Sequence, residues 1–114
     1  MKYFQYPING DDWTIGLLST EEMEAEHGDA GGITISADRK IDICMDSLTD
    51  SVIMHELVHA HASYMFFEDA SPTPSQMEEI FAEFFGERHK LLVKQKNAIK
   101  KKLKEFESQE NKDE

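Results

Sequence analysis

The stretch His55-Glu56-Leu57-Val58-His59 decides how this sequence folds and what chemistry it carries. It lies in an apolar, periodic segment that is typical of a helix. On a helix, His59 lies one turn beyond His55 and about 40° round the axis, so the two imidazoles can converge on one metal ion. Glu56 lies about 100° from His55, where its carboxylate can reach a water on that metal without being a ligand. The spacing therefore predicts a helix that presents two metal ligands and a base.

A third ligand is expected from a second helix. Thr73-Pro74-Ser75-Gln76 places Thr at the N-cap, Pro at the first helical position and Gln at the capping-box position, so a helix begins here. Glu79 falls in its second turn, whereas Glu78 lies about 100° away and is disfavoured. A catalytic zinc site takes three protein ligands and leaves a fourth position to water. We therefore expect Glu79 to complete the set begun by the two histidines.

Together these features resemble the gluzincin metallopeptidases, and most closely the small ImmA/IrrE-like and minigluzincin proteins. The resemblance covers residues 27–90 and rests on the H-E-x-x-H run, on E-x-x-A-E-x-F at residues 79–85, and on Gly31-Gly32-Ile33-Thr34-Ile35. It implies a zincin-like fold, with one Zn²⁺ ion held by His55, His59 and Glu79. Glu83 stands where those families more often have Asn or Asp. Either Glu83 or an acidic neighbour is expected to accept a ring N–H from a ligand histidine.

Other candidate ligands remain. His89 becomes the third ligand only if the chain follows a SprT-like pattern, because it lies about 15 Å along the helix from Glu79. His61 falls on the opposite face of its helix from His59 and is expected to pack or to face solvent. His27 precedes Gly28 in an expected loop. Cys44 is the single cysteine and lacks a Cys-x-x-Cys partner, so we expect an ordinary strand residue in a reducing cytoplasm.

The whole chain predicts an α+β fold with a small antiparallel or mixed sheet. We expect a strand over residues 13–18, helices over 19–27, 49–67 and from 74 past 100, and a β-hairpin joined by residues 37–40. In that hairpin, the apolar positions are expected to face the core and Asp42 to face water. The apolar positions are Ile33, Ile35, Ile41, Ile43 and Met45. We expect residues 1–93 to form the metallopeptidase domain and residues 94–114 a charged helical extension.

The C-terminal helix reverses the charge of the chain. Residues 1–87 carry 18 acidic and three basic side chains, whereas residues 88–104 carry eight basic and no acidic ones. Phe85, Leu92, Ile99 and Phe106 recur every seven residues, so the helix over 84–106 is a candidate seam for a partner or for self-association. The acidic body argues against nucleic acid. The sequence has no apolar run long enough to span a membrane and no signal peptide, so a cytoplasmic location is expected.

The expected function is a zinc-dependent endopeptidase that hydrolyses a protein substrate through metal-activated water, with Glu56 as its catalytic base. The substrate is expected to add a strand along residues 33–36 or 41–45, whichever forms the edge of the sheet. The alternative is a non-proteolytic zincin-fold module, regulatory or protein-binding and of phage or mobile-element type, that acts through its C-terminal helix.

Overall fold

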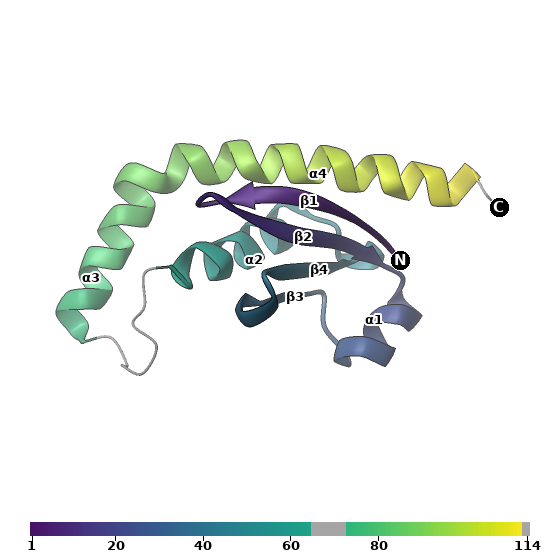
Figure 1. The fold of residues 1–114 in the computed structure, drawn as a ribbon, viewed down its shortest axis with the longest axis horizontal. Coiled ribbons are helices and arrows are strands. Elements are labelled where there is room, and N and C mark those ends of the chain that lie inside the picture. Colours follow the sequence, from purple (N-terminus) through teal and green to yellow (C-terminus); the bar gives the residue numbers. More distant parts are fainter. Residues whose placement is uncertain (65–72, 113–114) are drawn as a thin grey trace.

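A mixed four-stranded sheet forms the centre of the fold in the computed structural model, which describes residues 1–64 and 73–112 (Figure 1). The strands are β1 (Lys2–Ile8), β2 (Asp11–Leu18), β3 (Gly32–Ile35) and β4 (Lys40–Cys44), and their order across the sheet is β1-β2-β4-β3. β1 and β2 form an antiparallel hairpin, β2 and β4 run parallel, and β3 pairs antiparallel with β4. The predicted α+β class with a mixed sheet is confirmed, and β3 is an edge strand.

The first hairpin closes through the dipeptide Asn9-Gly10. Both residues have positive φ, 51° for Asn9 and 82° for Gly10. This is the backbone that two-residue hairpin loops favour, because its twist matches that of the flanking strands. Residues 2–8, ahead of the strand expected over residues 13–18, therefore form a strand of their own, β1.

The helices begin where the capping residues predict. Ser19 and Glu22 form a capping box at the start of α1 (Thr20–His27), and Thr49 caps α2 (Asp50–Ala62). Thr73 and Gln76 form the capping box of α3 (Pro74–Ala82). α2 ends at Ala62, earlier than the expected end at residue 67, and residues 65–67 lie outside the described residues. None of the helices in the described ranges is long and apolar enough to cross a membrane.

The third predicted helix divides into two parts. After α3, a π-helical segment over Glu83–Arg88 leads into α4 (His89–Lys112), and the chain bends sharply there (Figure 1). A π-bulge widens the turn and is a recognised cause of helix bending. The bend sends α3 away from the sheet, while α4 runs along it.

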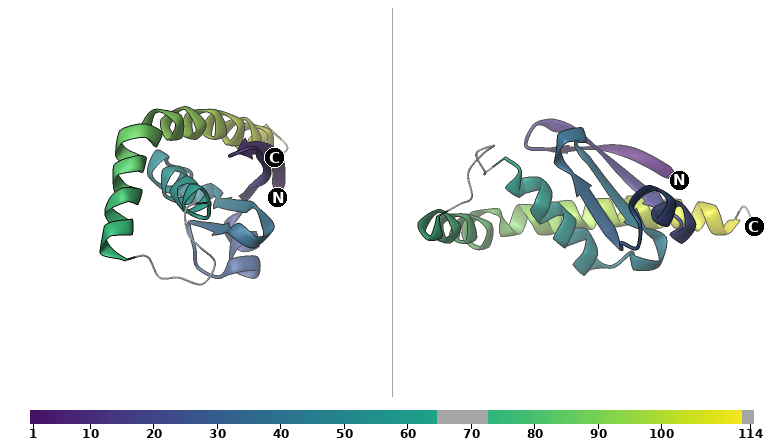
Figure 2. Two further views of the ribbon diagram at one scale, coloured as in Figure 1. Left: turned by 60° about the vertical axis from the view of Figure 1, so that its left-hand side comes forward. Right: turned by 90° about the horizontal axis from the view of Figure 1, so that it is seen from below.

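The sheet has a helix pair on one face and a single short helix on the other (Figure 2). The main core lies between the sheet and the α2–α4 pair, and it also takes in residues of the segment before α2 and of the π-helical segment. Its buried members are Ile8, Trp13, Ile15, Leu17, Ile41, Ile43, Leu48, Ile53, Leu57, Ala60, Phe84, Leu92, Ile99, Leu103 and Phe106. A smaller cluster of Leu18, Met23 and Cys44, with Ile33 against it, lies beneath α1.

In the second hairpin, formed by β3 and β4, the residues of β3 face the opposite sides of the sheet from those expected. Its register pairs Thr34 with Ile41 and Ile33 with Asp42, so Thr34 shares the face of Ile41, whereas Ile33 and Ile35 lie on the opposite face. The prediction that Asp42 faces water is also wrong, because its side chain is only 1% exposed. Both faces of β4 are covered, so hydrophobic alternation alone cannot identify its core side.

The end of α4 belongs to the core. Ile99, Leu103 and Phe106 are all buried, and the Phe106 ring meets Phe4 of β1 edge-to-face at 5.8 Å. Ile99 and Phe106, two residues of the predicted seam, therefore pack inside the domain together with Leu103, and partner binding through this helix stays a prediction. The physical reason is that β1 and β2 offer an uncovered apolar face along the whole length of the sheet, which α4 fills.

Some of the basic charge of α4 meets the acidic body. Lys96 Nζ lies 3.3 Å and Lys100 Nζ 2.7 Å from carboxylate oxygens of Asp50, in the first turn of α2. Hydrogen bonds from Lys100 and then Lys96 lower the pKa of Asp50 below its usual value. These exposed pairs contribute little stability individually. They do place two of the lysines against the start of the helix that carries the histidine pair.

Candidate metal centre

The two histidines of the H-E-x-x-H run converge as the helical spacing predicts. His55 Nε2 and His59 Nε2 lie 3.2 Å apart, with ring centroids 4.8 Å apart. Both side chains are exposed on α2. Two nitrogens bound to one tetrahedral zinc at about 2.0–2.1 Å are separated by about 3.3–3.4 Å. The nitrogen pair therefore already has nearly the spacing of two zinc ligands.

The carboxylate of Glu56 lies on the flank of this pair and is held against the sheet edge. Glu56 is only 6% exposed, although both of its histidine neighbours are exposed. The Thr34 hydroxyl of β3 donates to Glu56 Oε1 at 2.8 Å. Thr34 is a residue of the candidate site that the sequence alone did not predict. Its only sequence signal is its place in the strand ahead of the helix, because the contact with Glu56 depends on the register of the hairpin.

The structure does not bring Glu79 into a ligand group with the two histidines. Glu79 is exposed on α3, which stands apart from α2 (Figures 1 and 2). Among residues 1–64 and 73–112, no three His, Cys, Asp or Glu side chains are arranged to hold a metal ion. His89 is exposed at the start of α4 and joins no such group in these ranges. Both third-ligand assignments therefore stay predictions.

Glu83 takes a different partner from the one expected. Its Oε1 accepts from Arg88 Nε at 2.6 Å across the π-helical segment. Arg88 Nη1 also lies 3.1 Å from His61 Nδ1. Glu83 thus orients an arginine that contacts His61, rather than the ring of His55 or His59.

His61 is buried between α2 and α4, so of its two expected roles, packing and facing solvent, packing is the one observed. Its side chain is fully buried, and its Nε2 lies 2.7 Å from Gln95 Oε1. Because Arg88 can only donate, His61 Nδ1 accepts from it and Nε2–H donates to Gln95. Burial lowers the pKa of His61 and the positive charge of Arg88 lowers it further, against the raising effect of the bond to Gln95. The neutral ring is therefore the form that this network holds.

We expect His61 to make folding less favourable as the medium becomes acidic. A histidine whose folded pKa is lowered binds its proton more readily when unfolded, so its contribution is present above about pH 6.5 and is lost below it. The matched variant is His61→Gln, which can still donate to Gln95 and accept from Arg88 without titrating. Urea unfolding at about pH 8 and about pH 5.5 should show a larger fall in midpoint for the natural protein than for the variant. Equal falls in both proteins would contradict the assignment.

A histidine–carboxylate pair lies on the face of the sheet opposite α2. His27 Nε2, at the end of α1, lies 2.7 Å from Asp42 Oδ2, and Lys40 Nζ lies 3.6 Å from the same oxygen. Within the described residues, Asp42 Oδ1 is buried without a hydrogen-bond partner. The pair anchors α1 to β4 and lies on the other side of the sheet from α2.

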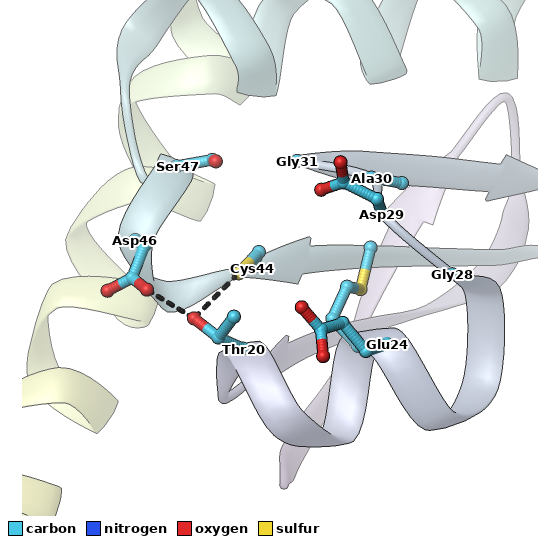
Figure 3. Close-up of a pocket in the computed structure, with 10 residues that line it drawn as sticks. Thr20, Glu24, Gly28, Asp29, Ala30, Gly31, Cys44, Asp46 and Ser47 are labelled. Carbon is cyan, nitrogen blue, oxygen red and sulfur yellow. Dashed lines mark hydrogen bonds between the residues drawn. The ribbon is translucent and has the colours of Figure 1, made fainter.

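Cys44 lies at a cavity of about 160 Å³ under α1 (Figure 3). The Thr20 hydroxyl lies between the Asp46 carboxylate and Cys44 Sγ, 3.7 Å from the sulfur. The cavity lining includes neither His55 nor His59. Cys44 is buried in the small core cluster, which agrees with its predicted place in a strand.

Comparisons of the chain with protein-family models, with curated proteins and with solved structures found no match.

Proposed function

We propose that the protein is a zinc-dependent endopeptidase of the gluzincin type. The observation that carries the proposal is the 3.2 Å spacing of His55 Nε2 and His59 Nε2 on one face of α2, beside the buried carboxylate of Glu56. In this proposal Glu79 of α3 supplies the third ligand. Two imidazoles and a carboxylate, with one position left open, form the donor set of catalytic zinc.

In peptide hydrolysis, residues of α2 would hold the zinc and transfer the proton, and β3 would bind the substrate. Zinc, when bound, supplies Lewis acidity that polarises a peptide carbonyl and makes water easier to deprotonate. The Glu56 carboxylate takes a proton from the attacking water and returns it to the departing amine. The edge strand β3 offers its open side to an extended peptide, which would pair with it as an added strand. Because Thr34 of that strand contacts Glu56, such a peptide would pass close to the base.

The ligands are tested by measuring zinc content and stability together. His55→Ala, His59→Ala and Glu79→Ala should each weaken zinc binding by more than about 100-fold, since loss of an outer-shell partner alone costs about 10–100-fold. The natural protein should gain about 2.7 kcal/mol of stability at a zinc concentration 100 times its Kd, and the variants should lose that gain. Metal analysis and thermal unfolding with and without zinc measure both effects.

His89→Ala is the matched control for these variants. It removes an exposed imidazole at the start of α4, outside the proposed ligand set. It should bind zinc as the natural protein does. Loss of zinc in His89→Ala together with full zinc in Glu79→Ala would replace the gluzincin assignment with a SprT-like one. A natural protein that binds no zinc would overturn the proposal.

A non-proteolytic binding module is the second candidate, and one surface favours it. Phe81 and Phe85 stack at 6.3 Å on α3 and the π-helical segment, with side chains 52% and 74% exposed. Large exposed aromatic rings of this kind often mark a protein-binding surface. Zinc binding without chelator-sensitive cleavage of an unfolded protein such as casein would favour this candidate.

A further inference from the structure

The Glu56 carboxylate is fixed by one residue of the edge strand. Thr34 Oγ1 lies 2.8 Å from Glu56 Oε1 and 3.1 Å from the backbone carbonyl oxygen of Glu56. In the described part of the chain, no other side chain donates a hydrogen bond to this carboxylate. A hydrogen bond to an ionised carboxylate is shorter and stronger than one between neutral groups. The hydroxyl therefore sets the direction in which Glu56 points.

Gly32 provides the clearance that this contact needs. It lies two residues before Thr34, on the same face of β3. A Cβ at Gly32 would lie 3.0 Å from Glu56 Cγ, 3.1 Å from Glu56 Oε2 and 3.1 Å from Val52 Cγ1. These distances are tighter than ordinary van der Waals contacts. The Glu56 side chain thus lies directly against β3, with Thr34 at one oxygen and the bare backbone of Gly32 beside the other.

We propose that Thr34 is the positioning residue of the general base Glu56, an inference that rests on the proposed peptidase function. The edge strand that an extended substrate would join is the strand that orients the base. Substrate register and base direction are then set by one element, so the carboxylate meets the attacking water at a fixed place along the peptide. A misdirected base lowers the rate of proton transfer without changing how the peptide pairs with the strand.

The variant series is Thr34→Val, Thr34→Ser and Gly32→Ala. Thr34→Val keeps the shape and β-propensity of threonine and removes the hydroxyl. It should lower kcat for a peptide substrate by about 10- to 100-fold with KM little changed, the range expected for one hydrogen bond to a charged group. Thr34→Ser restores the hydroxyl and should recover most of the rate. Gly32→Ala should lower kcat as well, because its Cβ displaces the carboxylate.

Thr14→Val is the matched control. It removes a hydroxyl from β2, which β4 separates from β3, and there Thr14 Oγ1 accepts from Gln5 Nε2 at 2.8 Å rather than contacting Glu56. Its kcat should equal that of the natural protein. Zinc content should be unchanged in every variant, since the ligands are untouched.

A second measurement reads the position of Glu56 without relying on activity. Three-bond NMR couplings in the metal-free and zinc-loaded proteins should report one Glu56 rotamer in the natural protein and in Thr34→Ser. They should report averaging over rotamers in Thr34→Val. A single unchanged rotamer in Thr34→Val, or a kcat equal to that of the natural protein, would overturn the inference.

Failure of the proposed function gives a different result. If the natural protein cleaves no protein or peptide in a chelator-sensitive way, the peptidase proposal falls and the catalytic role of Thr34 falls with it. The Glu56 rotamers in the natural protein and in Thr34→Val would then show whether Thr34 fixes that side chain without a catalytic role. If the natural protein cleaves and Thr34→Val cleaves equally well, only the positioning role is lost.

Discussion

Glu56→Gln should retain zinc and the fold but lose peptide hydrolysis by at least about 10²-fold, the low end for a positioned general base. Glutamine has the shape of glutamate and can still accept the Thr34 hydroxyl bond, so the packing of this 6% exposed side chain is preserved. Its amide cannot take a proton from water. Cleavage rates on an unfolded protein, measured beside zinc content and melting temperature, separate these effects.

Glu26→Gln is the control for the charge change, because Glu26 is exposed on α1, across the sheet from α2. It should cleave at the rate of the natural protein. A Glu56→Gln protein that also cleaves at that rate would show that the base lies elsewhere. One that loses zinc along with activity would show that Glu56 supports the metal rather than the proton transfer.

The features that the sequence predicted correctly are those with local causes. The caps at Thr49 and Thr73 act within one helical turn, so the starts of α2 and α3 follow from a few neighbouring residues. The convergence of His55 and His59 is equally local, because the i, i+4 spacing of a helix fixes it. For the same reason, Glu56 could be assigned to the flank of the pair before any tertiary arrangement was known.

The features that were mistaken or missed depend on contacts between distant segments. The prediction that Asp42 faces water failed because α1 returns to cover that face of β4 and places His27 over the carboxylate. Thr34 was overlooked because its contact with Glu56 needs the register of the hairpin, which a one-residue shift reverses. Whether Glu79 approaches the histidines depends on the angle that the π-helical bend sets between α3 and α4, which no local pattern fixes.

The heptad stripe of the C-terminal helix shows the same limit. Leu92, Ile99 and Phe106 repeat with a spacing that suits either a partner helix or an apolar sheet face of the same chain. In the structure all three residues are buried against the sheet of the same chain. The predicted boundary between the domain and the helical extension at residue 93 was based on the charge of residues 94–114. Lysines between the stripe positions can nevertheless point to solvent while the stripe packs against the sheet.

Truncation after Val93 should therefore unfold the domain. It removes the buried side chains of Ile99, Leu103 and Phe106, each worth about 1.5–3 kcal/mol of burial, from a domain whose total stability is expected to be about 5–15 kcal/mol. It also removes Gln95, the acceptor of the His61 ring N–H, and leaves that buried donor unpaired. Circular dichroism during heating should show no cooperative transition, and zinc should be lost with the fold.

A chain ending at Gln109 is the matched control for that truncation. It keeps all three buried apolar residues and Gln109 itself, whose Oε1 accepts from Lys2 Nζ at 2.9 Å. It should melt within a few degrees of the full chain, because 1 kcal/mol shifts the melting temperature of a domain this size by about 4–8 °C. If the chain ending at Val93 melts as cooperatively as this control and keeps its zinc, residues 94–109 are dispensable for folding. The charged helix would then be available for a partner, and Phe106 would lose its place in the core.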